Sequence, residues 1–219
     1  MSVPTRIKFC GITRIEDARR AVDYGVDAIG FVLTRKSQRF VGLSQARSIR
    51  KTLPPFVSTV ALFMDDDSSW IEDVIAGMQP DLLQFHGSET PGFADSFARP
   101  YIKAVPMGSV ENLRAYTALY TGASGILLDS HTGGGLGGSG STFDWTRVPR
   151  DPNLPIVLAG GLRPANVAQA IALVRPYAVD VSSGIELAPG IKDPTKMRGF
   201  VDAVRAADAA TIASTPGST

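Results

Sequence analysis

The chain has 219 residues, of which 44% are hydrophobic and 20% are charged, and its formal net charge is +1. This composition predicts one soluble globular domain with a large core. The near-neutral charge and the scattered basic residues argue against a nucleic-acid partner or a polybasic membrane patch. One cysteine cannot form an intrachain disulfide, and with only two histidines a Cys/His zinc cluster is not expected.

The ends of the chain show no targeting signal. Residues 1–6 lack a charged-then-apolar pattern, and no apolar run approaches the ~20 residues of a membrane span. We therefore expect a cytoplasmic protein with no membrane partner. Nothing in the sequence requires a dimer, so a monomer is expected. Residues 209–219, rich in Ala, Ser, Thr, Pro and Gly, are predicted to form a flexible C-terminal tail.

Short apolar runs alternate with amphipathic segments, the pattern of a parallel sheet covered by helices. In chain order, the predicted strands are Arg6–Gly11, Asp27–Leu33, Val57–Met64, Asp81–Phe85, Tyr101–Val105, Gly125–Asp129, Pro155–Ala159 and Ala178–Ser182. The predicted helices lie near Arg14–Tyr24, Ser44–Thr52, Ser68–Gly77, Pro91–Phe97, Val110–Tyr120, Pro164–Leu173 and Pro194–Ala207.

The ends of the first helix carry their own signals. Thr13 is predicted to cap its N-terminus, and Glu16 stands three residues later, as in a capping box. Gly25 is expected to end it.

The eight strand units predict the fold class α/β, as a single-domain (β/α)8 TIM barrel over residues 1–208. A doubly wound open sheet is the alternative. The count of eight, with no obvious break or extra lobe, favours the barrel.

The polar and glycine-rich residues fall where the predicted strands end, which is where a TIM barrel carries its chemistry. They are Cys10, Arg39, Gln84, His86, Lys103, Asp129, Gly160, Gly161, Ser182, Ser183 and Gly184. Asp65–Asp67 also follows a strand. We expect these three acids to cap the helix that begins near Ser68, rather than to bind a metal.

Two neighbouring loops predict a phosphate site. Gly160-Gly161 follows the seventh strand, and Ser182-Ser183-Gly184 follows the eighth. Glycines let the backbone approach a ligand closely, and amides at helix starts bind anions. The alternative is a pair of tight turns that need positive φ.

Cys10 and Asp129 are the candidates for chemistry. Cys10 ends the first strand before a glycine, where nearby donors or cations could lower its pKa and make it a nucleophile or a proton acceptor. Asp129 ends an apolar strand, where partial burial would raise its pKa and let it keep a proton. An inert buried thiol and a helix cap or salt bridge are the alternatives for the two residues. The glycine-rich segment 132–140 is expected to be a mobile active-site cover rather than a linker.

Several segments together resemble the signature blocks of the phosphoribosylanthranilate isomerase family, in register from about Ile7 to Val204. The most specific are Lys8–Thr13 and Val179–Gly184. The others are Gln84–Gly87, Leu127–Asp129, Gly137–Gly140 with Thr142–Trp145, and Leu158–Gly161.

The resemblance implies an aldose–ketose isomerase of tryptophan biosynthesis with no cofactor and no metal. Its members convert N-(5-phosphoribosyl)anthranilate into 1-(2-carboxyphenylamino)-1-deoxyribulose 5-phosphate by an Amadori rearrangement. By this resemblance, Asp129 is the general acid that opens the furanose ring. Cys10 is then the general base that removes the proton from the adjacent sugar carbon.

The resemblance also implies the substrate contacts. Arg39 would bind the anthranilate carboxylate as a bidentate partner. The phosphate would lie on Gly160, Gly161, Ser182, Ser183 and Gly184, with Gly138 and Ser139 closing over it, while Gln84 and His86 line the mouth. Ser141 stands where many relatives carry a lysine, so the loop adds less positive charge than is usual in the family. Ala159 replaces a commoner serine.

Three rival functions remain at this level. The related isomerase of histidine biosynthesis has an aspartate where Cys10 stands, and it needs a second phosphate site in the early half of the barrel. Indole-glycerol-phosphate synthase needs early Lys and Glu catalysts and a longer N-terminal segment, whereas Lys8 is expected to be buried. A non-catalytic barrel that binds phosphometabolites would have no use for Cys10 or Asp129.

Overall fold

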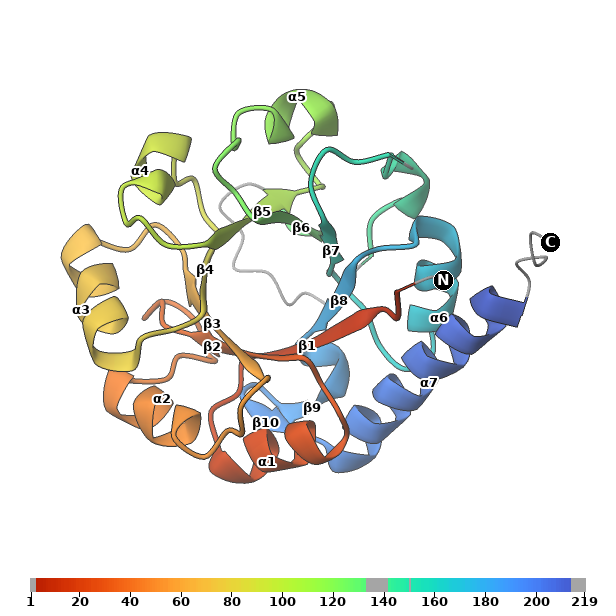
Figure 1. Ribbon diagram of the computed structural model, residues 1–219, viewed down its shortest axis with the longest axis horizontal. Helices are drawn as coiled ribbons and strands as arrows, with labels where there is room; N and C mark the ends of the chain where they lie inside the picture. Colours follow the sequence, from red (N-terminus) through yellow and green to blue (C-terminus); the bar gives the residue numbers. More distant parts are fainter. Residues whose placement is uncertain (1–2, 133–141, 150, 214–219) are drawn as a thin grey trace.

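The computed structural model describes residues 3–132, 142–149 and 151–213. Eight parallel strands follow one another around a closed barrel, and β8 pairs back to β1 (Figure 1). The predicted (β/α)8 TIM barrel is thereby confirmed, and the open doubly wound sheet is excluded. The strands are β1 (Arg6–Cys10), β2 (Ala28–Val32), β3 (Ser58–Phe63), β4 (Leu82–Phe85), β5 (Tyr101–Pro106), β6 (Gly125–Asp129), β7 (Ile156–Leu158) and β8 (Ala178–Val181).

Helices form a ring outside the barrel (Figure 1). They are α1 (Ile15–Asp23), α2 (Leu43–Arg50), α3 (Ser68–Met78), α4 (Pro91–Asp95), α5 (Leu113–Thr117), α6 (Val167–Val174) and α7 (Pro194–Ala213). Short 3-10 helices follow β6 and β8, and they are η1 (Trp145–Arg147) and η2 (Ser183–Ile185). A two-stranded antiparallel sheet that the sequence pattern did not predict precedes α7, made of β9 (Glu186–Ala188) and β10 (Ile191–Lys192).

The alternation of side chains along each strand separates two cores. One face of the strands packs under the helices, and the other fills the barrel interior. The interior cluster is apolar in its lower layers, with members such as Val60, Ile102, Leu127 and Val157. Nearer the carboxyl ends of the strands, Cys10 packs on neighbouring apolar side chains of β2 and β3.

The start of α1 differs from the prediction. Arg14, not Thr13, is the residue before the helix, and it makes no side-chain capping bond. The Thr13 hydroxyl instead donates to the carbonyl of Gly190 at 2.5 Å, which ties this loop to the β9–β10 turn. Thr13 is therefore used for a contact between distant segments, and the predicted capping box with Glu16 is wrong.

The acidic run after β3 does not cap α3 with its side chains. Asp67 precedes the helix but accepts no capping bond. The Met64 amide donates to the Asp66 carboxylate at 2.9 Å, and the Ser88 amide donates to Asp65 at 2.6 Å. These carboxylates brace the strand end and the neighbouring loop, so the predicted capping role is wrong.

The closing helix is longer than predicted. It runs from Pro194 to Ala213 and so enters the segment 209–219 that was expected to be a tail. Alanine has the highest helix propensity, and three of residues 209–213 are alanine, which explains the extension. The prediction of a tail is therefore wrong for residues 209–213, and residues 214–219 lie outside the described part.

Lys103 was grouped with the site residues, but it faces the helix layer. Its neighbours Ile102 and Ala104 belong to the barrel interior, so alternation turns Lys103 outward. Its ammonium group is fully buried, 2.9 Å from the Glu89 carboxylate, and it also donates to the Gly87 carbonyl. Lys103 therefore braces the loop after β4.

We expect Glu89→Gln to lower the free energy of unfolding by about 3 kcal/mol, because it leaves the Lys103 charge buried without a counter-ion. Denaturant unfolding measures this. The control is Asp202→Asn, which breaks an exposed ion pair with Arg198 and should have almost no effect. Equal stability of Glu89→Gln and the unsubstituted chain would contradict a structural role for the buried pair.

Candidate active site

A pocket at the carboxyl ends of the strands brings most of the predicted residues together. Its polar lining is formed by Cys10, Thr34, Ser37, Arg39, Gln84, His86, Asp129, Asp180 and Ser182. A second hollow adjoins it and shares Asp129, Asp180 and Ser182 with it. Gly160, Gly161 and Ser183 line that second hollow. The loops expected to hold phosphate thus lie next to the two candidate catalysts.

Cys10 ends β1 as a buried side chain, 4% exposed. Lys8 lies two residues earlier on the same face of the strand, and its ammonium is 2.9 Å from the Asp180 carboxylate, with both groups buried. Burial raises the pKa of the Cys10 thiol, while the Lys8 and Lys192 ammonium groups lower it, and the net shift is upward. The predicted nearby cations are present, but the expectation of a lowered pKa is wrong because burial outweighs them.

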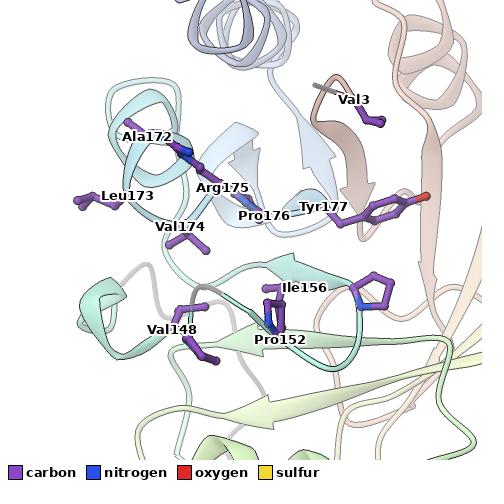
Figure 2. Close-up of a pocket in the computed structure, with 12 residues that line it drawn as sticks. Val3, Val148, Pro152, Ile156, Ala172, Leu173, Val174, Arg175, Pro176 and Tyr177 are labelled. Carbon is purple, nitrogen blue, oxygen red and sulfur yellow. The ribbon is translucent and has the colours of Figure 1, made fainter. Parts of the chain in front are cut away.

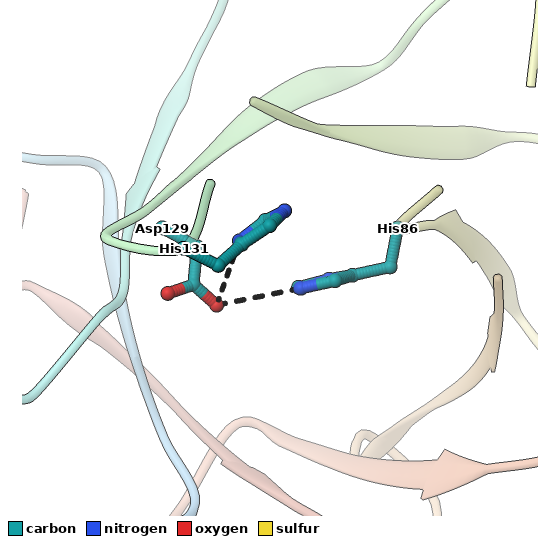
Figure 3. A group of neighbouring side chains, drawn as sticks. All are labelled: His86, Asp129 and His131. Carbon is teal, nitrogen blue, oxygen red and sulfur yellow. Dashed lines mark ion pairs between the residues drawn. The ribbon is translucent and has the colours of Figure 1, made fainter. Parts of the chain in front are cut away.

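Asp129 ends β6 and faces two imidazoles (Figure 3). Its Oδ2 atom lies 3.4 Å from His86 Nε2 and 3.7 Å from His131 Nδ1. Burial acts to raise the pKa of Asp129, but the imidazoles of His131 and His86 lower it more, so its pKa lies well below the ordinary range. The expectation of a raised pKa is therefore wrong, because the sequence did not show that both histidines face this carboxylate.

The two imidazoles are stacked, with ring centroids 4.6 Å apart and planes inclined by 23°. His86, Asp129 and His131 offer ligand atoms within 4.8 Å of one another, the number and kind of donors that a transition metal accepts. Both rings place a nitrogen beside the same oxygen of the Asp129 carboxylate, so the arrangement can serve hydrogen bonding to that carboxylate.

Arg39 reaches the pocket from the loop after β2 and is held by Glu186. The guanidinium makes a bidentate pair, with Nε to Oε1 at 2.9 Å and Nη2 to Oε2 at 2.8 Å. Glu186 also accepts from the Lys192 ammonium at 2.8 Å, and that ammonium donates to the Cys10 carbonyl at 2.6 Å. The unpredicted β9–β10 sheet therefore fixes both Arg39 and the backbone of Cys10.

In the two glycine-containing loops, the glycines allow neighbouring backbone segments to come close to each other. Gly160 has a φ of 77°, and a Cβ there would lie 2.5 Å from the Ser130 amide nitrogen. A Cβ at Gly184 would collide with the carbonyl oxygen of Leu162. Gly184 thus packs the loop after β8 against the loop after β7, and it does not itself line the hollow. Gly138 and Ser139, the predicted cover residues, lie outside the described residues, as does the rest of 133–141.

Another hollow lies at the opposite end of the barrel (Figure 2). Its volume is about 490 Å³, and its lining comes from loops that precede β1, β7 and β8 together with the end of α6. Valines, prolines and Leu173 dominate this lining, with Arg175 and Tyr177 among the few polar-tipped side chains. It contains none of the predicted site residues.

Several residues at the mouth escaped the sequence reasoning. Lys8 could have been placed there, because it shares a strand face with Cys10. Asp180 could have been placed there in the same way, because it lies two residues before Ser182 and so shares a strand face with it. His131 gave no signal beyond its place two residues after Asp129. Glu186 could not be paired with Arg39, since 147 positions separate the two.

Comparisons with known proteins agree with this geometry. A family model described as N-(5'-phosphoribosyl)anthranilate isomerase matches residues 7–203. The chain belongs to this family. It is 52% identical over 200 residues to the N-(5'-phosphoribosyl)anthranilate isomerase of Pseudomonas fluorescens, covering 91% of this chain and 98% of that one. The enzyme of Alcanivorax borkumensis is 51% identical over 212 residues, covering 94% and 97%.

Solved structures of the family have the same fold. Phosphoribosyl anthranilate isomerase from Thermotoga maritima superposes with a TM-score of 0.84 at 42% identity, covering 92% of this chain and 99% of that one. A family structure in complex with reduced 1-(o-carboxyphenylamino)-1-deoxyribulose 5-phosphate gives a TM-score of 0.80 at 39% identity, with the same coverage. Within the described part of the chain, no helix is both long and apolar enough to cross a membrane.

We expect Lys8→Met to raise the pKa of Cys10 further, because the variant removes an ammonium group that lowers it. The chain has a single cysteine, so the pH dependence of its alkylation by iodoacetamide reports this group alone. The double variant Lys8→Met/Asp180→Asn leaves no unpaired buried carboxylate and serves if the single variant does not fold. A Cys10 pKa that stays unchanged or falls in Lys8→Met would show that Lys8 does not stabilise the thiolate.

Proposed function

We propose that this phosphoribosylanthranilate isomerase of tryptophan biosynthesis performs its Amadori rearrangement with Asp129 as general acid and Cys10 as general base. The observation that carries the proposal is the position of the two groups. Both line one pocket, from opposite sides of the barrel, and a phosphate-sized hollow adjoins it. The substrate is N-(5-phosphoribosyl)anthranilate, and the product is 1-(2-carboxyphenylamino)-1-deoxyribulose 5-phosphate.

The acid step opens the sugar ring. Asp129 gives a proton to the furanose oxygen, the bond from that oxygen to C1 breaks, and the anthranilate nitrogen becomes a protonated imine. This cation withdraws electrons from C2. The C2 proton is thereby acidified without a cofactor or a metal.

The base step forms the enolamine. The Cys10 thiolate removes the proton from C2, and the electron pair moves toward the imine nitrogen. The C2 hydroxyl then gives its proton to the Asp129 carboxylate, and C1 gains the proton carried by the Cys10 thiol. The thiolate is restored and the ketone is formed, so the protons balance over the cycle.

In the free enzyme, Cys10 and Asp129 hold the opposite protonation states from those that the reaction needs. Burial raises the pKa of Cys10, and the imidazoles lower the pKa of Asp129, so the free enzyme holds mainly a thiol and a carboxylate. The reactive form is the minor tautomer, with a thiolate and a carboxylic acid. The Lys8 ammonium favours this form at Cys10, since it stabilises the anion.

The anthranilate end and the phosphate end of the substrate would bind at separate sites. Arg39 would bind the anthranilate carboxylate with the guanidinium edge that Glu186 leaves open. The phosphate would bind at Gly160, Gly161, Ser182 and Ser183, with Gly184 setting the shape of its loop. Gln84 and His86 border the ring between these two sites. Gly138 and Ser139 stay predicted contacts of the phosphate.

The state of assembly and the location stay predictions. We keep the expectation of a cytoplasmic monomer without a nucleic-acid partner. The Thermotoga maritima relative, by contrast, is described as dimeric.

We expect Cys10→Ser and Asp129→Asn each to lower kcat by at least ~10²-fold, the usual loss when a general base or acid is removed. The assay follows the loss of anthranilate-type fluorescence from freshly made phosphoribosylanthranilate. Asp202→Asn, a substitution of an exposed carboxylate on α7, is the matched control and should retain full activity. A wild-type chain without turnover would overturn the function, and a near-normal rate in either variant would overturn that residue's role.

Arg39→Lys should raise KM by about tenfold with a smaller change in kcat, because lysine cannot form the bidentate pair with a carboxylate. Steady-state kinetics measure both constants. Arg35→Lys is the control, since Arg35 comes from the same loop but lies over the Trp70 ring, at 5.1 Å from its centroid. A KM for Arg39→Lys equal to that of the control would remove Arg39 from the carboxylate site.

A further inference from the structure

His131 is buried beside Asp129, and the mechanism above does not use it. Its side chain is 5% exposed, and its Nδ1 atom lies 3.7 Å from Asp129 Oδ2. Among the described residues, this Nδ1 atom has no hydrogen-bond partner. This buried imidazole nitrogen lies just beyond hydrogen-bond distance of the proposed general acid. It is therefore placed to exchange a proton with that acid.

The two imidazoles beside Asp129 are not equivalent. The Gln84 amide Nε2 lies 3.1 Å from His86 Nδ1, and in this orientation of the amide the nitrogen can only donate, so His86 Nδ1 is the acceptor. The matching tautomer of His86 directs its Nε2 hydrogen at Asp129 Oδ2, 3.4 Å away. If His86 were positively charged, its Nδ1 hydrogen would face the hydrogens of the Gln84 amide, and two donors would oppose each other.

His131 has no such neighbour at its Nδ1 atom, because no competing partner for that atom lies within the described residues. Stacking at 4.6 Å disfavours a positive charge on both rings at once, since like charges at that separation repel in a buried setting. One carboxylate and one imidazolium then form a neutral pair, with His86 as a fixed donor beside them.

We infer that His131 is a positioning residue that stores the proton which Asp129 delivers to the substrate. This inference rests on the proposed function of Asp129. The His131 imidazolium passes its Nδ1 proton to Asp129 Oδ2, and the resulting carboxylic acid protonates the furanose oxygen. The proton that leaves the C2 hydroxyl at ketone formation returns to Asp129 and then to His131, so the cycle needs no other donor.

Other charged groups lie in the same pocket, and each enters the pH dependence. Cys10, Arg39 and Asp180 line it together with His86 and Asp129. The Asp180 and Arg39 charges are compensated by Lys8 and Glu186. The proton that moves within the cluster is therefore exchanged chiefly between Asp129 and His131.

Histidine NMR tests the storage of the proton directly, because His86 and His131 are the only histidines in the chain. The ring nitrogen shifts of the wild-type chain should show His86 as the neutral tautomer with hydrogen on Nε2, while His131 takes up the positive charge. In Asp129→Asn, the His131 shifts should move toward those of a neutral ring at the same pH, because the carboxylate 3.7 Å from Nδ1 is gone. A charged His86 beside a neutral His131 would overturn the inference.

Kinetics separate proton storage from simple packing. His131→Phe keeps a ring stacked on His86 and should lower kcat by about tenfold, a fraction of the loss of a general acid, with KM within about twofold. His131→Asn keeps a hydrogen-bond donor but cannot hold a proton, and it should not restore kcat. In both variants the fall of kcat with rising pH should begin at a lower pH than in the wild-type chain. Asp202→Asn, at an exposed carboxylate on α7 far along the chain from the site, is the control and should retain full activity.

Each result of these experiments has a separate meaning. A wild-type kcat in His131→Phe or His131→Asn, together with an active wild-type chain, overturns the role of His131 and leaves the proposed function standing. An inactive wild-type chain overturns the proposed function, while the NMR titration still decides which ring holds the proton.

Discussion

In the closed barrel every second side chain of each strand points inward, and the arrangement of the mouth depends on this constraint. Lys8 and Cys10 share the inner face of β1, and Asp180 meets Lys8 from β8 at 2.9 Å. On β6 the same alternation puts Asp129 above the apolar Leu127. A strand register shifted by one residue would turn these groups into the helix layer, as happens with Lys103. The chemistry of the pocket is therefore a consequence of strand register.

Burial has opposite consequences for the two groups proposed to react. Cys10 has cations nearby, yet the cost of desolvating a thiolate is larger than their attraction, so its pKa rises. Asp129 is just as buried, but two imidazoles face one of its oxygens, and its pKa falls. For the proposed reaction, these two pKa directions favour the protons on the opposite groups from those that react. In the proposed mechanism, placing each proton on the group that needs it is part of catalysis. The residues around Cys10 and Asp129 that control this placement then matter as much as the two groups themselves.

Much of the fold followed from the sequence because its signals are local. Apolar strands separated by amphipathic helices set the barrel, and the strand Gly125–Asp129 was predicted with its observed ends. The prediction was wrong where a local signal competes with a distant contact, as at Thr13, which binds Gly190 instead of capping a helix. The pKa directions also depend on distant neighbours. Neither the ring of His131 nor that of His86 could be oriented toward Asp129 from the order of residues alone.

The β9–β10 sheet shows why the remaining part of the site could not be read from motifs. Lys192 reaches under the mouth, where its ammonium donates to the carbonyls of Cys10 and Ser182 and pairs with Glu186. Glu186 in turn holds Arg39. One buried ammonium thus links the end of the strand that carries the proposed base, the loop proposed for phosphate and the arginine proposed for the carboxylate. The three parts of the substrate site are held at fixed distances by a small sheet outside the barrel, so the spacing of the site is a property of that sheet as well as of the eight strands.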